Sequence, residues 1–138
     1  MEPFSLKLEL RIDWSEIDLF GHVNNLSIQK YIQSAKVNYL EAIGLMPSQS
    51  AIKVGPTLVS STCQFRKMSF YPGNVTIWSK VDLIKTTSFR ILHKIMNDQN
   101  EIVAEAQDII VLFDFEKNTK RVIPEEIKKK IIELGMTM

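Results

Sequence analysis

The feature that most constrains the fold is one long helical pattern that stands between segments of strand pattern. From residue 28 to residue 43 apolar side chains recur at steps of three and four, which predicts an amphipathic helix with one buried face. Asn24 or Asn25 can cap its start, and Gly44 followed by Pro47 ends it. Such a helix of about 19 residues is roughly 28 Å long. We therefore expect it to be central to the core.

Segments with the period-two pattern of β-strands lie on both sides of this helix. Residues 4–12 alternate apolar even positions with polar odd positions. Four further strands are expected between residues 53 and 113, with turns at "YPGN" (71–74) and "NDQN" (97–100). Two groups are each expected to share one strand face: Val59, Cys63 and Phe65, and then Val75, Ile77, Val81 and Leu83.

The last segment, "IPEEIKKKIIELG" (123–135), predicts a short helix with Pro124 at its first position. Strands joined by short turns pair antiparallel, so the order of elements indicates an α+β fold. We expect one domain over residues 1–138, in which a five-stranded antiparallel sheet packs on one long helix. One helix cannot cover five strands, and the apolar run from Ile109 to Phe113 suggests that a face or an edge meets a partner. A homodimer or homotetramer is expected.

Composition narrows the classes of function. The 17 basic and 16 acidic residues give a net charge of +1, which argues against nucleic acid or an anionic membrane as a partner. A single cysteine, Cys63, and an N-terminus without a secretory pattern favour a reducing cytoplasm. Two histidines and one cysteine, far apart in sequence, do not supply a metal site or a Cys-His nucleophile. We expect no metal and no cofactor, and take Cys63 as a packing residue.

The stretch "DLFGHVNNLS" (18–27) concentrates polar chemistry at the helix entrance. Unpaired backbone N–H groups and the positive end of the helix dipole suit an oxyanion that develops on a carbonyl. Gly21 lets the loop fold tightly, so the Asp18 carboxylate can approach the same carbonyl as base or nucleophile. His22 can orient the carboxylate or assist proton transfer. The alternative is purely structural: Asp18 caps a turn, His22 bonds backbone, and Asn24 and Asn25 cap the helix.

These residues resemble a known family. The segment "WSEIDLFGHVNNLSIQKYIQSAKVNYL", and more loosely "FYPGN" and "TTSF", are similar to hotdog-fold thioesterases of the 4-hydroxybenzoyl-CoA thioesterase-like family. The resemblance implies a curved antiparallel sheet wrapped around a central helix. It also implies that Asp18 is the catalytic carboxylate and that backbone N–H groups at the helix start polarise the thioester carbonyl. Plant acyl-carrier-protein thioesterases are similar too: Asp18 and His22 match, but Phe20 stands where they have Asn.

The resemblance implies hydrolysis of an acyl-CoA or acyl-carrier-protein thioester. Catalytic Asp18 and His22 are expected beside substrate-binding Asn24, Asn25 and Ser88, although Ser88 also suits any half-exposed strand. A module that binds acyl-CoA without turnover is the main alternative. A hotdog dehydratase ranks last, because its His in a G-x-F-P setting is absent.

Several other side chains can be interpreted as either functional or purely structural. His93 is expected to be a satisfied core or interface histidine without a catalytic role. Four basic residues either contact coenzyme A phosphates or are simply solvated, and four aromatic residues line an acyl pocket or the core. The basic residues are Arg66, Lys67, Lys85 and Arg90; the aromatic ones are Tyr31, Tyr39, Phe65 and Phe70.

Overall fold

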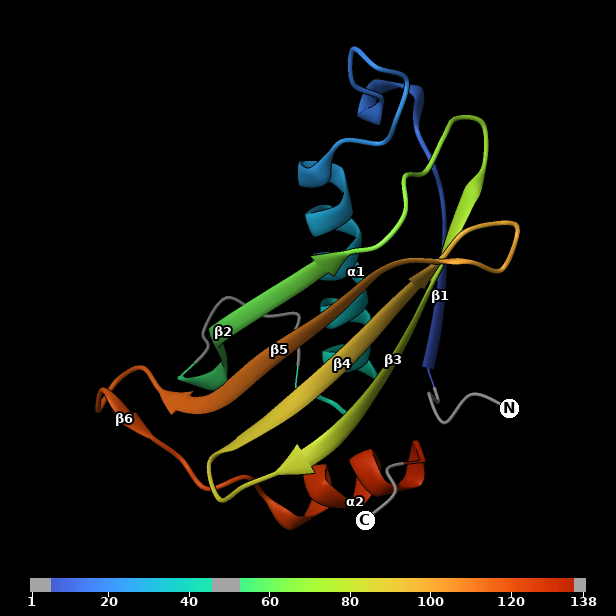
Figure 1. Cartoon of the computed structure of the whole chain (residues 1–138). Coiled ribbons are helices and arrows are strands. Elements are labelled where there is room, and N and C mark those ends of the chain that lie inside the picture. The colour runs from blue at the N-terminus through green and yellow to red at the C-terminus, as the bar shows by residue number, and fades with distance from the viewer. Residues whose placement is uncertain (1–5, 46–52, 136–138) are drawn as a thin grey trace.

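The long helix α1 (Asn25–Ala42) is the central element of the computed structural model, which describes residues 6–45 and 53–135. Its apolar stripe is buried as the sequence pattern predicts, with Ile28, Ile32, Ala35 and Tyr39 all inaccessible to solvent. Gly44 follows the helix with a φ of +82°, a left-handed conformation that favours glycine. Pro47 lies outside the described residues. Figure 1 shows α1 running along the sheet from the loops at one end to α2 at the other.

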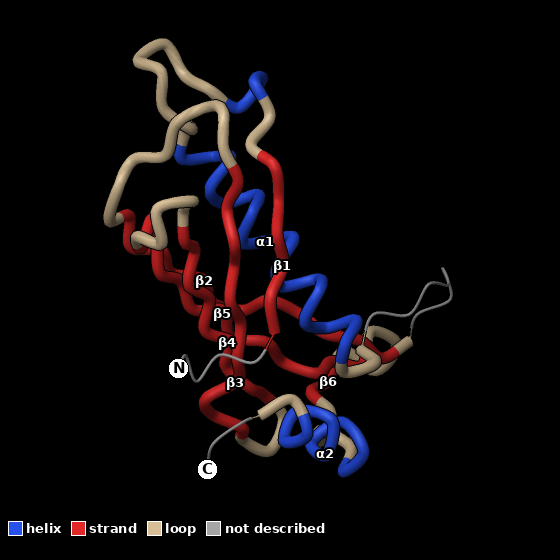
Figure 2. Tube along the Cα trace, turned by 90° about the vertical axis from the view of Figure 1, so that its right-hand side faces the viewer, coloured by secondary structure: helices blue, strands red, loops and turns tan. Residues whose placement is uncertain are grey.

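The strands form one antiparallel sheet in the order β1-β3-β4-β5-β2, with β6 paired to β5. Helix α1 lies along one face of this sheet (Figure 2). The predicted α+β class is therefore confirmed, with β6 as a short addition to the five expected strands. The strands are β1 (Leu6–Arg11), β2 (Val54–Phe65), β3 (Asn74–Ile84), β4 (Ser88–Met96), β5 (Ile102–Asp114) and β6 (Thr119–Lys120).

Two irregularities in register correct the predicted strand faces. The pairing of β3 with β4 shifts between Val81 and Leu83, and Leu83 is exposed although it was expected beside Val81. A second shift, between Leu58 and Ser60 of β2, leaves Val59 exposed. One extra residue in a strand turns the side chains that follow it to the opposite face, so period-two reading fails across a bulge.

The core consists of two apolar clusters separated by a polar row. In the row, the Ser79 hydroxyl lies 2.7 Å from His93 Nδ1, and His93 Nε2 lies 3.1 Å from Asp108 Oδ2. Asp108 Oδ1 accepts a hydrogen bond of 2.7 Å from the Ser61 hydroxyl. Four neighbouring strands thus contribute one residue each to a continuous network, and His93 is a satisfied core histidine as predicted. Ile28, Tyr31, Ile32, Val75, Ile77 and Ile95 belong to one cluster; Tyr39, Val81, Phe89, Ile91, Ile110 and Ile127 belong to the other.

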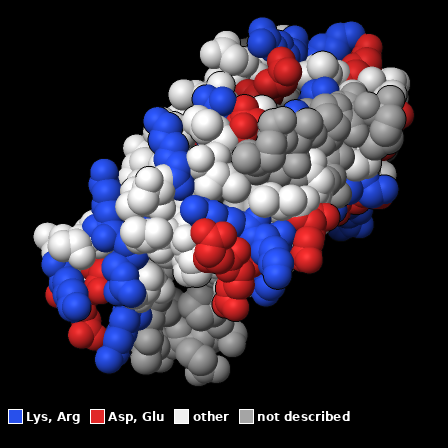
Figure 3. Space-filling model, turned by 90° about the horizontal axis from the view of Figure 1, so that it is seen from below, with Lys and Arg blue, Asp and Glu red and all other residues white. Residues whose placement is uncertain are grey.

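The short helix α2 (Glu125–Glu133) closes the lower end of the second cluster with Ile127 and Ile131. Pro124 is its N-cap rather than its first helical residue, a shift of one position from the prediction. Seen from below, the molecule carries basic and acidic side chains side by side (Figure 3). Within the described chain, neither helix has the length and hydropathy of a membrane span.

Replacement of Asp108 tests the importance of the polar row. Asp108→Ala leaves His93 and Ser61 without their buried partner, so we expect a loss of about 3 kcal/mol in the free energy of unfolding at pH 7. Urea denaturation measures this quantity. Glu105→Ala is the matched control, because it breaks the exposed pair with Arg66 and should change the unfolding free energy by at most about 0.5 kcal/mol.

The same variant has a predicted pH dependence. Burial opposes ionisation of Asp108, but the hydrogen bonds from His93 and Ser61 outweigh it and lower the pKa of the carboxyl below 3.8. A depressed folded-state pKa contributes stability above the unfolded-state pKa, and this contribution is lost as the pH falls through the folded-state pKa. The stability difference between wild type and Asp108→Ala should therefore shrink below pH 4. A difference that stays constant down to pH 2 would contradict this assignment.

Candidate active site

The loop that precedes α1 is fixed by a carboxylate at its base. It begins with a 3-10 helix, η1 (Trp14–Glu16), and Glu16 Oε1 accepts a hydrogen bond of 2.6 Å from the Tyr31 hydroxyl on α1. The Asn24 amide donates to the Glu16 carbonyl oxygen at 3.0 Å, which closes the loop. Burial and the neighbouring Glu16 raise the pKa of Tyr31, so its phenol stays a donor. Residues 17–23 are therefore held against the start of α1.

The two carboxylate oxygens of Asp18 have different environments. Oδ1 accepts hydrogen bonds from the backbone N–H of Phe20 at 2.9 Å and of His22 at 3.1 Å, so the predicted turn-capping role is present. Gly21 permits this turn with a φ of +88°. Oδ2 accepts no hydrogen bond from the described part of the protein, and His22 Nδ1 lies 3.8 Å from it. One oxygen thus fixes the loop and the other is available for chemistry.

The His22 ring is positioned by aromatic contacts. It stacks on Phe20 with ring centroids 6.3 Å apart and meets the edge of Phe70 at 5.6 Å. The separation of 3.8 Å from Asp18 exceeds a hydrogen bond, although the side chains lie close enough for one to form after a small movement. His22 is therefore placed beside the carboxylate without being bonded to it.

Asn24, rather than Asn25, caps the helix. Its side-chain oxygen accepts a hydrogen bond of 2.8 Å from the Ser27 amide, while Asn25 is the first residue of α1 and its side chain is exposed. The amide N–H groups of Asn25 and Leu26 have no acceptor within the helix, because they belong to its first turn, and none elsewhere in the described structure. Two donors at the positive end of the helix dipole are consequently available.

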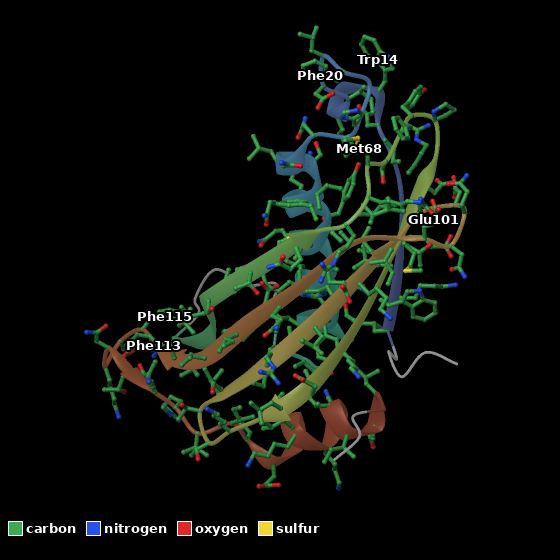
Figure 4. All side chains as sticks on the ribbon, in the orientation of Figure 1. Trp14, Phe20, Met68, Glu101, Phe113 and Phe115 are labelled. Atoms are coloured by element: carbon green, nitrogen blue, oxygen red, sulfur yellow. The ribbon has the colours of Figure 1, made fainter. Side chains whose placement is uncertain are left out.

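A cavity of about 890 Å³ lies in front of these groups. The loop before α1, the helix start, the segment after β2 and the turn between β4 and β5 all contribute to its wall. In Figure 4 the labelled Phe20 marks the loop before α1, Met68 the segment after β2 and Glu101 the turn between β4 and β5. The predicted Asp18, His22 and Asn25 line it together. Its other lining residues are Val23, Ile28, Phe65, Arg66, Lys67, Met68, Ser69, Phe70, Asn97, Gln99 and Glu101.

Sequence reasoning missed Ser69. This residue is 4% exposed and lines both the cavity and a neighbouring hollow of about 150 Å³. Its hydroxyl is the one buried side-chain polar atom without a hydrogen-bond partner within residues 6–45 and 53–135. A buried hydroxyl left unpaired costs about 1–3 kcal/mol. No signal in the sequence pointed to it, because a serine between Met68 and Phe70 reads as an ordinary loop residue.

A sequence profile of the Thioesterase-like superfamily matches residues 12–131. The chain belongs to this superfamily. The match confirms the family, and with it the type of enzyme, that the motif before α1 indicates. Asp18, His22 and the start of α1 all fall within the matched range.

Solved structures share the fold of this thioesterase-family chain. A thioesterase-superfamily protein from Jannaschia aligns with a TM-score of 0.86 at 22% identity, over 97% of this chain and 86% of its own. A 1,4-dihydroxy-2-naphthoyl-CoA thioesterase from Synechocystis aligns with a TM-score of 0.83 at 16% identity, over 95% and 98%. The BH1999 gentisyl-coenzyme A thioesterase aligns with a TM-score of 0.78 at 23% identity, over 91% and 99%. These alignments confirm the hotdog fold.

Several candidate residues lie away from the cavity or are engaged elsewhere. Ser88 lines a separate hollow of about 120 Å³ together with Lys85 and Arg90, so the structure does not bring it to Asp18. Arg66 and Lys67 reach the cavity wall but form ion pairs with Glu105 at 3.0 Å and Glu101 at 2.6 Å.

The remaining candidates divide between cavity and core. Phe65 and Phe70 line the cavity, whereas Tyr39 is buried in the second cluster. Burial, followed by the nearby Asp108, raises the pKa of the Cys63 thiol, which keeps it protonated. The described residues contain no cluster of three or more metal-ligating side chains.

The capping geometry predicts unequal effects for the two asparagines. Asn24→Ala removes the acceptor for the Ser27 amide and should lower the free energy of unfolding by about 1 kcal/mol. Asn25→Ala removes an exposed side chain and should change it by less than about 0.5 kcal/mol. Chemical denaturation of both variants measures the difference. Equal losses would show that the cap is shared.

Proposed function

We propose that this chain hydrolyses the thioester of an acyl-coenzyme A or acyl-carrier protein to a free acid and a thiol. The observation that carries the proposal is that Asp18, with its unbonded Oδ2, and Asn25, with an available backbone N–H group, line one cavity. The second available N–H group belongs to Leu26, the next residue of α1. Gentisyl-CoA and dihydroxynaphthoyl-CoA thioesterases share the fold, which supports a coenzyme A ester as substrate.

In this mechanism the thioester carbonyl points its oxygen at the start of α1. Asp18 either removes a proton from a water that attacks the carbonyl carbon or attacks that carbon itself. The carbonyl π pair moves to oxygen, where the N–H groups stabilise the negative charge. Collapse of the tetrahedral species re-forms the carbonyl and breaks the C–S bond, and the thiolate leaves with its electron pair. When water attacks, this step gives the free acid directly; when Asp18 attacks, it gives a mixed anhydride, which water then cleaves to release the acid and restore the carboxylate. A thiolate needs little protonation to leave, so one acid suffices.

The neighbours of Asp18 have supporting roles in this proposal. His22, packed between Phe20 and Phe70, hydrogen-bonds the carboxylate when it moves closer and steadies its free oxygen. Asn24 holds the helix start in shape, and Asn25 lies where its side chain contacts substrate. The apolar part of the wall, from Ile28, Phe65 and Phe70, receives the acyl or aryl group. Ser88 has no part, because it lines a different hollow.

Release of thiol from a panel of acyl thioesters tests the proposal. Purified protein should liberate free thiol, detected colorimetrically, from at least one alkyl- or aryl-CoA or acyl-carrier-protein substrate. Tight binding of acyl-CoA in calorimetry without any thiol release over the whole panel would make the chain a binding module instead.

Asp18→Asn isolates the charge of the carboxylate. Asparagine keeps an acceptor for the Phe20 and His22 amides, so the melting temperature should stay unchanged while turnover falls roughly 10²–10⁴-fold. His22→Ala should reduce turnover less. Asp13→Asn, a carboxylate change at the η1 cap in the same loop, is the matched control and should keep wild-type turnover. Wild-type turnover in Asp18→Asn would leave that residue with its capping role alone.

We further propose that the chain forms a homodimer, or a multiple of it, through the open edge of β2. This edge strand has 12 residues and is about 40 Å long, with Leu58 and Val59 exposed near its middle. Beside it a hollow of about 170 Å³ lies between β2 and α1. At this edge the sheet and the helix packed on it form two layers, together roughly 20 Å deep. An edge about 40 Å long and of this depth offers about 800 Å², the area that each subunit buries in a stable dimer.

Light scattering tests the assembly. Wild-type protein at micromolar concentration should have the mass of a dimer or a multiple of it, whereas Val59→Lys should be monomeric, because a charged residue blunts an edge strand. Val122→Lys places the same charge at an exposed position outside β2 and should leave the mass unchanged. A wild-type monomer with full activity would refute this assembly.

The location that we propose is the cytoplasm. Cys63 carries a free thiol, as proteins of a reducing compartment commonly do. Fractionation of cells that express the tagged chain tests the location directly.

A further inference from the structure

Ser69, whose buried hydroxyl has no hydrogen-bond partner among the described residues, lines the same cavity as Asp18 and Asn25. We propose that it donates a hydrogen bond to the thioester carbonyl oxygen and so completes an oxyanion site with the N–H groups of α1. This inference rests on the proposed thioester hydrolysis and adds a catalytic residue to it. In this proposal a side chain stabilises the negative charge together with the backbone N–H groups.

The backbone places Ser69 beside the helix entrance. Its carbonyl oxygen accepts a hydrogen bond of 2.8 Å from the Val23 amide, and the next residue, Phe70, pairs with His22 as an isolated bridge. Residues bonded across such a pair have Cα atoms about 5.5 Å apart. Val23 is followed directly by Asn24, the helix cap, and then by Asn25, the first residue of α1. The residue that Ser69 bonds is therefore two positions before the first N–H group of α1.

Burial without a partner is the second observation, and it is independent of the helix terminus. A serine hydroxyl at 4% exposure normally finds an acceptor, but no described residue provides one for Ser69. Ser79 shows the usual outcome in this chain, since it is 2% exposed and its hydroxyl lies 2.7 Å from His93 Nδ1. The carbonyl oxygen of a bound thioester would be an acceptor for the Ser69 hydroxyl.

A substrate can reach the Ser69 hydroxyl by moving neighbouring side chains that are not packed in the core. Met68 and Phe70, on either side of Ser69, are both more than half exposed. A carbonyl that enters the cavity displaces these side chains rather than any buried residue. The hollow of about 150 Å³ that Ser69 also lines gives the hydroxyl room to rotate toward the oxygen.

The hydroxyl transfers no proton in this step. Attack at the carbonyl carbon moves the π pair to oxygen, and the Ser69 O–H shortens its hydrogen bond as charge develops there. On collapse the pair returns to the C–O bond, the C–S bond breaks and the thiolate carries its electron pair away. Because the bond strengthens in the transition state, its loss should appear in kcat and hardly in KM.

Ser69→Ala is the decisive variant. Its kcat should fall about 10- to 100-fold with KM changed less than about threefold, which is at or below the effect of removing one oxyanion donor elsewhere. Its melting temperature should be equal to or higher than that of wild type, because an unpaired buried hydroxyl has been removed. Ser69→Thr keeps the hydroxyl, has space for the methyl group in the adjacent hollow, and should restore most of kcat.

Ser79→Ala is the matched control, a buried serine whose hydroxyl does have a partner in His93. It should lower the melting temperature and keep kcat at a temperature where it is folded. The proposal is overturned if Ser69→Ala keeps wild-type kcat, or if it loses melting temperature as Ser79→Ala does. Wild-type protein that releases no thiol from any thioester would remove the proposed function itself, which is a different result from an active wild type with an equally active Ser69→Ala.

Discussion

The packing of α1 on one face of the antiparallel sheet is the constraint on which the rest of the structure depends. Burial of its apolar stripe removes one side of four strands from water and fixes where the helix begins. That starting point lies beyond the sheet edge, next to the loops rather than in the core (Figure 1). Unpaired N–H groups at a helix start are tolerable only where solvent or a ligand reaches them. The same packing that stabilises the fold therefore produces a polar, positively polarised end at the cavity.

The loop before α1 combines capping with chemistry. Glu16 ties it to Tyr31, and Asp18 holds its own turn through one carboxylate oxygen. Such local bonds fix the free oxygen of Asp18 without a large buried charge, because the side chain stays one-third exposed. Positioning is thus achieved largely by neighbours in sequence, with Tyr31, Phe70 and the Ser69 carbonyl oxygen contributing from elsewhere in the chain. A rigid scaffold with functional groups on its loops is the common arrangement for catalytic sites.

Polar groups within the molecule follow two different rules. The row from Ser61 to Ser79 is fully paired and separates the two apolar clusters, so it restricts how the strands register. Ser69 breaks the rule that buried polar groups are paired. Departures from local consistency are expected at functional sites, where stability is traded for a group that awaits its ligand. Ser61 and Ser79 are thus paired within the protein, whereas the unpaired Ser69 is the serine that lines the cavity.

The sequence by itself determined the order and type of the elements, because periodicity reports directly which face of each element is buried. It also determined the cluster at the helix entrance, since Asp18, Gly21, His22 and the asparagines are neighbours along the chain. Only the tertiary structure decided the bulges near Leu58 and Val81, the choice of Asn24 as the cap, the remote position of Ser88 and the unpaired hydroxyl of Ser69. Each of these depends on contacts between segments far apart in sequence or on a shift of a single residue, and neither leaves a periodic signal in one chain.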